Sequence, residues 1–150
     1  MIVLASILAF FSPHGGCTDA IIKQIDAAKV SVYVQAYSFT SEPIAQALER
    51  AKVRNVDVRV LLDKSWRNES PKVEPELVAA GIPVLIDGKH AIAHNKLCII
   101  DNAIVTTGSF NLTNQAERMN AENLLVIHDA GIAAKYTANW QAHAAHSVTP

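Results

Sequence analysis

The chain has few cysteines, little net charge and no hydrophobic run long enough to cross a bilayer. Its two cysteines, Cys17 and Cys98, show no C-x-x-C spacing and no paired histidine, which argues against a zinc site built on them. Burial as small hydrophobic side chains is the first interpretation of both thiols, and a disulfide between them is the alternative. A formal net charge of −1 argues against a strongly basic nucleic-acid binder, so any contact with DNA or RNA has to come from a local patch.

Length and composition indicate one folded domain over residues 1–150. A chain of 150 residues buries about two thirds of its unfolded surface when it folds. Half of the residues are hydrophobic and no low-complexity tract occurs, which argues against disorder. We therefore expect a single domain without internal repeats.

Residues 1–11 are apolar except for Ser6 and allow two interpretations. The run is shorter than the roughly 20 residues that a membrane-spanning helix needs. It resembles the apolar core of a signal peptide, but no basic residue precedes it and no small-x-small cleavage site follows it. In the other interpretation its second half forms a first buried strand that leads into Ser12 and Pro13. The sequence leaves both open.

The rest of the chain alternates between strand and helix patterns. Runs rich in β-branched and apolar residues predict strands over residues 30–37, 56–62, 83–86, 97–100, 103–107 and 123–127. Capping residues and apolar stripes predict helices that begin near Thr18 or Asp19, near Ser41 and Pro43, over residues 75–80 and 113–118, and after Asp129. This order predicts an α/β fold with a mixed, mostly parallel β-sheet sandwiched by helices on both faces.

The longest polar stretch, residues 63–74, is expected to be a loop. Its three cations, Lys64, Arg67 and Lys72, flank Trp66. Such a loop can hold single-stranded nucleic acid by charge and base stacking. In the alternative, the cations are solvated and Trp66 folds onto the core.

The residues whose side chains are best suited to catalysis lie between positions 94 and 122. Residues 97–100 read as a buried strand, and side chains at i and i+2 of a strand point the same way. His94 and Lys96 therefore share one face, whereas Asp101 falls on the other. Ser109 and Asn111 repeat the i, i+2 relation after Gly108, a residue type that allows close approach to a ligand. We expect an imidazole, an ammonium, a hydroxyl and an amide to converge on one anion.

The ordered set resembles the signature of the phospholipase D superfamily, H-x-K-x4-D-x6-G-S-x-N. Its six residues, here called the motif residues, match without a gap: His94, Lys96, Asp101, Gly108, Ser109 and Asn111. The segments FFSPHGG, VQAYSFTSEPIAQAL and GIPVLIDGKHAIAHNK look like the small bacterial endonuclease branch, and the likeness covers roughly residues 10–145. The resemblance implies the phospholipase D/nuclease fold. It also favours a periplasmic or secreted protein, with a cytoplasmic location left open.

Phosphodiester hydrolysis without a metal or other cofactor needs a nucleophile, an acid for the leaving group and fixed positive charge. Neutral imidazole is a competent nucleophile near neutral pH, which gives His94 that role and a phosphohistidine as the intermediate. Lys96, Ser109 and Asn111 would stabilise the phosphoryl oxygens. Glu122 resembles the family's downstream acidic residue and is expected to orient the His94 ring. Asp101 and Gly108 are expected to be structural.

No acid for the leaving group is found near the motif, because no second H-x-K occurs in the chain. The resemblance implies a homodimer in which His94 of a second copy faces the first. No metal is expected. The pairs His90–His94 and His143–His146 each lack a nearby third ligand, and zinc takes three or four.

Three functions follow from these patterns. The first is a metal-independent endonuclease of low sequence specificity that cleaves DNA, with RNA as a further substrate. The second is a lipid phosphodiesterase of the phospholipase D type, in which the same chemistry would act on membrane lipid. The third is a catalytically silent nucleic-acid-binding module, which the complete motif disfavours. No protein partner is implied.

Overall fold

A computed structural model describes residues 6–150. Within them, seven strands form one sheet: β1 (Ser6–Ser12), β2 (Ser31–Ala36), β3 (Asp57–Asp63), β4 (Val84–Asp87), β5 (Lys96–Ile100), β6 (Ile104–Gly108) and β7 (Glu122–His128). The same residues form six helices: α1 (Cys17–Ala27), α2 (Glu42–Val53), α3 (Trp66–Glu69), α4 (Val73–Ala79), α5 (Asn114–Arg118) and α6 (Ala130–Ala144). The predicted α/β fold is confirmed.

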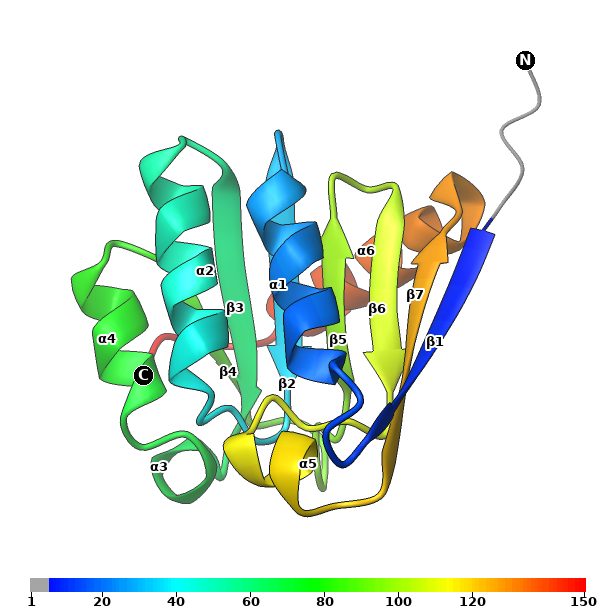
Figure 1. The fold of residues 1–150 in the computed structure, drawn as a ribbon. Coiled ribbons are helices and arrows are strands. Elements are labelled where there is room, and N and C mark those ends of the chain that lie inside the picture. The colour runs from blue at the N-terminus through cyan, green and yellow to red at the C-terminus, as the bar shows by residue number, and fades with distance from the viewer. Residues whose placement is uncertain (1–5) are drawn as a thin grey trace.

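The strands lie in the order β1-β7-β6-β5-β2-β3-β4 (Figure 1). Strands β2, β3 and β4 run parallel, as the strand–helix–strand pattern of the first half predicts. Strands β5, β6 and β7 form an antiparallel meander, β1 pairs antiparallel with β7, and β5 pairs antiparallel with β2. The sheet is mixed, but four of its six pairings are antiparallel, so the expectation of a mostly parallel sheet is wrong. The link between β5 and β6, residues 101–103, leaves no room for a crossover helix, so these two strands pair as an antiparallel hairpin.

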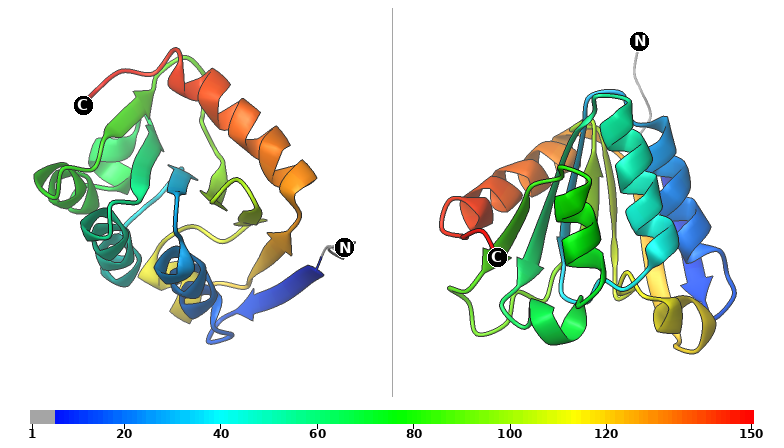
Figure 2. Two further views of the ribbon diagram at one scale, coloured as in Figure 1. Left: turned by 90° about the horizontal axis from the view of Figure 1, so that it is seen from above. Right: turned by 90° about the vertical axis from the view of Figure 1, so that its left-hand side faces the viewer.

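Helices cover both faces of the sheet, which confirms the layered prediction. The left view of Figure 2 shows α6 on one side of the sheet and α1, α2 and α4 on the other. Two hydrophobic clusters match these two layers. The larger cluster packs α1, α2 and α4 against the sheet, and the smaller one packs α6 against β3, β5 and β6 through Trp140 and Ala133.

The N-terminal apolar run forms an edge strand in its second half. Residues 1–5 of the run lie outside the described residues, and β1 begins at Ser6. The strand is largely exposed instead of buried, with Ile7 58% and Phe11 65% exposed. The reason is its place at the edge, where β7 is its one partner in the sheet.

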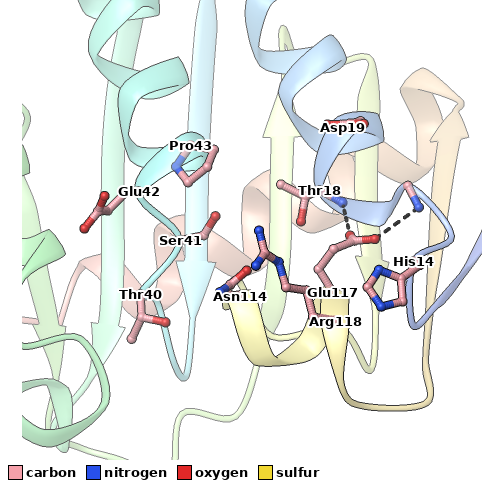
Figure 3. A pocket seen from close by; sticks show the side chains of 11 residues that line it. His14, Thr18, Asp19, Thr40, Ser41, Glu42, Pro43, Asn114, Glu117 and Arg118 are labelled. Atoms are coloured by element: carbon pink, nitrogen blue, oxygen red, sulfur yellow. Dashed lines mark hydrogen bonds between the residues drawn. The ribbon is translucent and has the colours of Figure 1, made fainter.

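Helix α1 begins two residues earlier than a cap at Thr18 would predict. Gly16 adopts a φ of 80°, which glycine allows at little cost, and the helix starts at Cys17. Neither Thr18 nor Asp19 caps it. The carboxylate of Glu117 in α5 instead accepts hydrogen bonds from the amides of Gly16 and Thr18, at 3.1 and 2.7 Å (Figure 3). A distant side chain thus replaces the local cap.

A hairpin turn at Asp101 and Asn102 joins the strands predicted over 97–100 and 103–107. Both residues have positive φ angles, 53° and 50°, as two-residue hairpin turns with this twist require. Asp129 caps α6 as predicted by accepting a hydrogen bond from the amide of Ile132, whereas Thr113, predicted as the first residue of its helix, is its cap and accepts from the amide of Ala116. The stretch expected as a loop at residues 63–74 is partly helical, because α3 forms one turn there and α4 begins at Val73.

Candidate active site

Apart from Asp101, the motif residues lie at or near the strand ends that form the lower edge of the sheet in Figure 1. Strand β5 begins at Lys96, β6 ends at Gly108 and β7 begins at Glu122. Because these strands are antiparallel neighbours, the start of one meets the end of the next. His94 precedes β5 by two residues, and Ser109 follows β6 with its amide donating to the carbonyl of Asn123 at 3.1 Å. Topology therefore gathers residues from three segments at one edge.

Lys96 and His94 are in direct contact. The Lys96 Nζ lies 3.1 Å from His94 Nδ1 and donates a hydrogen bond to the His94 carbonyl oxygen at 2.8 Å. Burial lowers the pKa of Lys96, whereas the negative charge of Glu122 acts in the opposite direction. The His94 ring also packs against Tyr37, with 4.7 Å between ring centroids. The imidazole and the ammonium thus share one face, as strand parity predicts.

Ser109 and Glu122 form the second half of the site. The Ser109 hydroxyl donates to Glu122 Oε2 at 2.5 Å and accepts from the amide of Asn123 at 3.1 Å. Glu122 Oε1 accepts from Asn120 Nδ2 at 3.2 Å. Both carboxylate oxygens are therefore engaged, and the expected contact between Glu122 and His94 is not formed among residues 6–150. Glu122 holds Ser109 instead, because the two face each other where β6 ends and β7 begins.

Asn111 lies just beyond Ser109 and keeps its side-chain oxygen free. This oxygen is buried and has no hydrogen-bond partner among the described residues. A buried polar atom without a partner is unusual in a folded protein. The oxygen can only accept a hydrogen bond, so Nδ2 is the atom of Asn111 that could donate to a phosphoryl oxygen.

Asp101 lies at the far end of β5 and faces away from His94. Its carboxylate accepts hydrogen bonds from the backbone amides of Lys29, Val30 and Ser31, at 2.7–3.2 Å. These bonds fix the segment that leads into β2. Asp101 thus joins two strands and contributes no atom to the site.

Gly108 is required for close strand packing. A Cβ atom on it would lie 2.2 Å from the carbonyl oxygen of Asn123 in β7. This contact fits the structural role predicted for Gly108. The close neighbour is the backbone of β7 and not a ligand.

Two of the three cations in residues 63–74, Lys64 and Arg67, contact other groups of the protein. Lys64 Nζ donates to the carbonyl oxygen of His90 at 2.9 Å, and the Arg67 guanidinium lies 4.6 Å from the centre of the Trp66 ring. Trp66 is partly buried and packs against the larger hydrophobic cluster. Lys72 precedes α4 as its N-cap residue. These contacts favour the interpretation in which Trp66 folds onto the core.

Three supporting residues were missed by the sequence analysis. Gln35 in β2 is fully buried, and its Nε2 donates to Asn95 Oδ1, next to both His94 and Lys96. Asp63 at the end of β3 accepts the amide of Ala93 at 2.6 Å, immediately before His94. Tyr37 packs on the imidazole. A polar residue inside an apolar strand, as Gln35 is, was the available signal, but its partner could not be read from spacing.

A separate hollow of about 640 Å³ opens between α1, α2 and α5 (Figure 3). It is lined by the N-terminal ends of α1 and α2 and by Asn114, Glu117 and Arg118 of α5. None of the motif residues lines it. The candidate active site is therefore the open strand edge.

The two thiols are buried and free, which confirms the first interpretation of the cysteines. Cys17 and Cys98 form no disulfide. Burial raises the pKa of Cys17 to about 11 and that of Cys98 to about 12. Both behave as small hydrophobic residues of the larger cluster.

The histidines outside the motif are arranged differently from the prediction. His90 does not pair with His94. Together with His143 and His146 it converges on the carboxylate of Asp87. The statement that neither histidine pair has a third ligand nearby is wrong. Asp87 and His90 lie more than 50 residues before the other two, so local spacing could not reveal the group.

An α/β sheet that brings an imidazole, an ammonium, a hydroxyl and a carboxylate to one edge defines a domain of the phosphodiester hydrolase class. The family model described as "Cardiolipin synthase, PLD-like domain" matches residues 21–144. The chain belongs to the phospholipase D superfamily, and the resemblance carried by its motif is confirmed.

Similar proteins include two groups of curated relatives. The phospholipase D of Rickettsia felis is 46% identical over 130 residues, which cover 87% of this chain and 65% of that protein. The human mitochondrial cardiolipin hydrolase is 31% identical over 118 residues, 78% of this chain and 47% of that protein. The chain thus spans about two thirds or less of the length of these relatives.

Two solved structures match almost from end to end. The phospholipase D family member Nuc from Salmonella typhimurium superposes with a TM-score of 0.93 at 35% identity, covering 98% of this chain and 99% of that one. NucT from Helicobacter pylori superposes with a TM-score of 0.88 at 26% identity, covering 98% of this chain and 100% of that one.

Among residues 6–150, no helix combines the length and apolar character that a membrane crossing requires.

Proposed function

We propose that the chain is a phosphodiesterase that cleaves nucleic acid, as a metal-independent endonuclease of low sequence specificity. The observation that carries this proposal is the contact of His94 with Lys96 at the same sheet edge as Ser109 and Asn111. A nucleophile, a cation and two hydrogen-bonding groups are the set that phosphoryl transfer through a phosphohistidine needs.

In the proposed reaction, an imidazole nitrogen of His94 attacks phosphorus and the bond from phosphorus to the leaving oxygen breaks. The leaving oxygen takes a proton from an acid. Water then attacks the phosphohistidine and gives its proton to the same group, now a base, while the P–N bond breaks. The phosphate monoester is released and the imidazole is regenerated.

Substrate binding must open the contact between Lys96 and His94. In the free protein the Lys96 ammonium lies 3.1 Å from His94 Nδ1, and a donor beside this nitrogen favours the tautomer that carries its proton on Nε2. A phosphodiester oxygen is a stronger acceptor for the Lys96 ammonium than a neutral ring nitrogen is, because the ammonium and the phosphodiester both carry a charge. When the Lys96 ammonium moves from His94 to the phosphate, it leaves Nδ1 without this contact and offsets the negative charge of the phosphate oxygen. The Ser109 hydroxyl, which donates its one proton to Glu122 in the free protein, must likewise turn from Glu122 to donate to the same anion.

The acid is proposed to be His94 of a second copy of the chain. H-x-K occurs once in the sequence. Of the five other histidines, three surround Asp87, His14 lines the hollow beside α5 and His128 ends β7. None of these is placed to protonate a leaving group at the motif edge. A two-fold axis through the site would supply the missing imidazole, with one ring neutral and its twin protonated.

Nucleic acid is favoured over lipid by the likeness in shape to Nuc and NucT, with TM-scores of 0.93 and 0.88. The segments FFSPHGG, VQAYSFTSEPIAQAL and GIPVLIDGKHAIAHNK also resemble the small bacterial endonuclease branch of the superfamily. The names of the curated relatives, phospholipase D and cardiolipin hydrolase, make a lipid phosphodiesterase the second candidate.

A substrate panel tests the proposal. Purified protein is incubated in excess EDTA with plasmid DNA, single-stranded DNA, RNA and vesicles that contain phosphatidylcholine and cardiolipin. We expect cleavage of nucleic acid and a loss of roughly 10³-fold or more in His94→Ala, because the nucleophile is gone. His128→Ala is the control and should keep full activity. Lipid turnover without nucleic-acid cleavage would select the second candidate, and an active His94→Ala protein would refute the site.

A further inference from the structure

Four side chains outside the motif form a compact group, here called the Asp87 cluster: Asp87, His90, His143 and His146. Asp87 Oδ2 lies 2.9 Å from His90 Nδ1 and 2.7 Å from His143 Nδ1, and Asp87 Oδ1 lies 3.2 Å from His146 Nε2. The three imidazole rings also face one another, with centroids 4.7–5.6 Å apart. One ligand atom from each residue lies within 4.8 Å of all the others.

The cluster joins two distant parts of the chain. Asp87 ends β4 and His90 follows it in the loop to β5, whereas His143 lies in the last turn of α6 and His146 just after it. Next to it, Val148 pairs with Ile86 through two backbone hydrogen bonds, of 2.7 and 3.1 Å. The C-terminal segment is therefore already aligned along β4, and the cluster lies where the two meet.

The Asp87 carboxylate is buried and already held in place by hydrogen bonds, as metal-binding carboxylates usually are. The residue is fully buried. The Lys89 amide donates to Oδ1 at 3.0 Å, in the way that outer hydrogen bonds fix metal-ligating carboxylates. The side chains of His143 and His146 are 14% and 24% exposed, and that of His90 is 42% exposed, which gives an ion a path from solvent.

We propose that the Asp87 cluster binds one divalent transition-metal ion, with Zn²⁺ as the best fit. Three imidazole nitrogens and one carboxylate oxygen form the four-ligand set that zinc takes in tetrahedral sites. At metal–ligand distances of about 2.0–2.1 Å, tetrahedral ligands lie roughly 3.3 Å apart. The present N–O separations of 2.7–3.2 Å require movements of well under 1 Å for these pairs. Imidazole donors disfavour Mg²⁺ and Ca²⁺, which prefer oxygen.

Without an ion, the same residues form a hydrogen-bonded group in which each imidazole N–H donates to Asp87. Zinc binding replaces these protons. A neutral imidazole moves its proton to the other ring nitrogen, and a protonated one releases it to solvent. The carboxylate then binds the ion with the oxygen lone pairs that had accepted the N–H groups. No oxidant or further reactant is required.

The proposed ion is structural and separate from catalysis. The side chains of the cluster point at Asp87, whereas His94 contacts Lys96 and Tyr37. An ion that bridges β4 and the end of α6 closes a loop of more than 50 residues, which stabilises the folded chain by restricting the unfolded one. It also anchors His90, at one end of the segment that leads to His94. The activity of the chelator-stripped protein tests the proposed function, and zinc binding tests the proposed metal site, so either proposal can fail without the other.

Calorimetric titration tests the proposal. The full chain, purified without a histidine tag and stripped with chelator, is titrated with ZnCl₂. We expect one ion bound per chain, and a rise in Tm of roughly 5–10 °C at zinc concentrations about 100-fold above Kd. Asp87→Asn and His143→Asn should each weaken binding at least about 10-fold. Two matched controls, His94→Asn and His128→Asn, should bind as tightly as the unaltered chain.

Three results would overturn the proposal. The first is the absence of saturable zinc binding at one ion per chain. The second is unchanged affinity in both cluster variants. The third is loss of binding in His94→Asn alone, which would place the ion at the motif. If Asp87→Asn fails to fold by circular dichroism, His90→Asn replaces it, because His90 is the most exposed ligand and its substitution leaves the buried carboxylate in place.

Discussion

At the scale of single residues, Glu122 shows how one carboxylate can organise the site without touching the nucleophile. Its two oxygens accept from different donors, the Ser109 hydroxyl and the Asn120 amide. Its own backbone amide donates to the Ser12 hydroxyl at 3.1 Å, which ties β7 to the end of β1. The sequence indicated the importance of Glu122 through its likeness to the family, but these partners lie up to 110 residues away.

We predict that Glu122→Gln lowers turnover about 10–100-fold. The glutamine NH₂ must replace one carboxylate oxygen and will face a hydrogen-bond donor, either Ser109 or Asn120. Loss of a hydrogen bond to a charged group also costs about 1.5–3 kcal/mol of stability. Hydrolysis of bis(4-nitrophenyl) phosphate, together with urea unfolding, measures both effects.

Glu117→Gln is the matched control for that change. Glu117 also accepts two hydrogen bonds, from the amides of Gly16 and Thr18, but it lines the hollow beside α5 and not the motif edge. It should lose similar stability and keep its turnover. Equal turnover in Glu122→Gln and the unaltered protein would show that Glu122 is merely structural.

The cysteines give a second prediction at the residue scale. With pKa values raised to about 11 and about 12 by burial, Cys17 and Cys98 hold well under about 1% thiolate at pH 8. Labelling with Ellman's reagent should therefore be very slow in the folded protein, and two thiols per chain should react at once in denaturant. Rapid labelling of either thiol in the folded protein would contradict their burial.

At the scale of elements, the end of β3 positions the loop that carries His94. The Asp63 carboxylate accepts from the amide and hydroxyl of Ser65, at 2.9 and 2.7 Å, and from the amide of Ala93, at 2.6 Å. Burial alone would raise the pKa of Asp63, but the hydrogen bonds from Ala93 and Ser65, with the charge of Lys64, lower it overall. The loop is thus held to the sheet by a negative charge.

We predict that Asp63→Asn destabilises the protein by about 1.5–3 kcal/mol at pH 7, because an amide NH₂ would face Ala93 or Ser65 donors. Turnover should also fall, since His94 follows Ala93. The lowered pKa means that the charged form stabilises the fold above the unfolded pKa, near pH 4, and that this contribution is lost as pH falls through the folded value. Urea unfolding should therefore show the gap between the two proteins narrowing from pH 7 to pH 3. A gap independent of pH would contradict this account.

Local features of the helices and strands could be predicted from the sequence, whereas the pairing of distant strands could not. The strand patterns that flank the Asp101–Asn102 turn and the cap at Asp129 depend on neighbouring residues, and these were predicted. The antiparallel pairing of β5 with β2 depends on segments about 60 residues apart, and no local pattern encodes its direction. The same holds for the Asp87 cluster, whose members join β4 to α6.

At the scale of the whole molecule, strand parity and order were enough to predict most of the site. His94 and Lys96 lie on one face, and the hairpin brings Ser109 to the same edge. The contacts that support this edge, from Gln35, Asp63 and Ser12, come from three other strands. They could not be predicted because they depend on how the sheet is assembled.

The central claim at this scale is that two copies of His94, one from each chain, act on one phosphorus atom. The unaltered chain and His94→Asn are mixed in equal amounts in denaturant and refolded together, after sedimentation has shown that each refolds alone as a dimer. If each site needs both imidazoles, activity should be about one quarter of that of the unaltered protein at the same total concentration, because about one quarter of the dimers contain two intact chains. A parallel mixture with His128→Asn should keep full activity. Activity of one half, or an active monomer in sedimentation, would contradict the shared site.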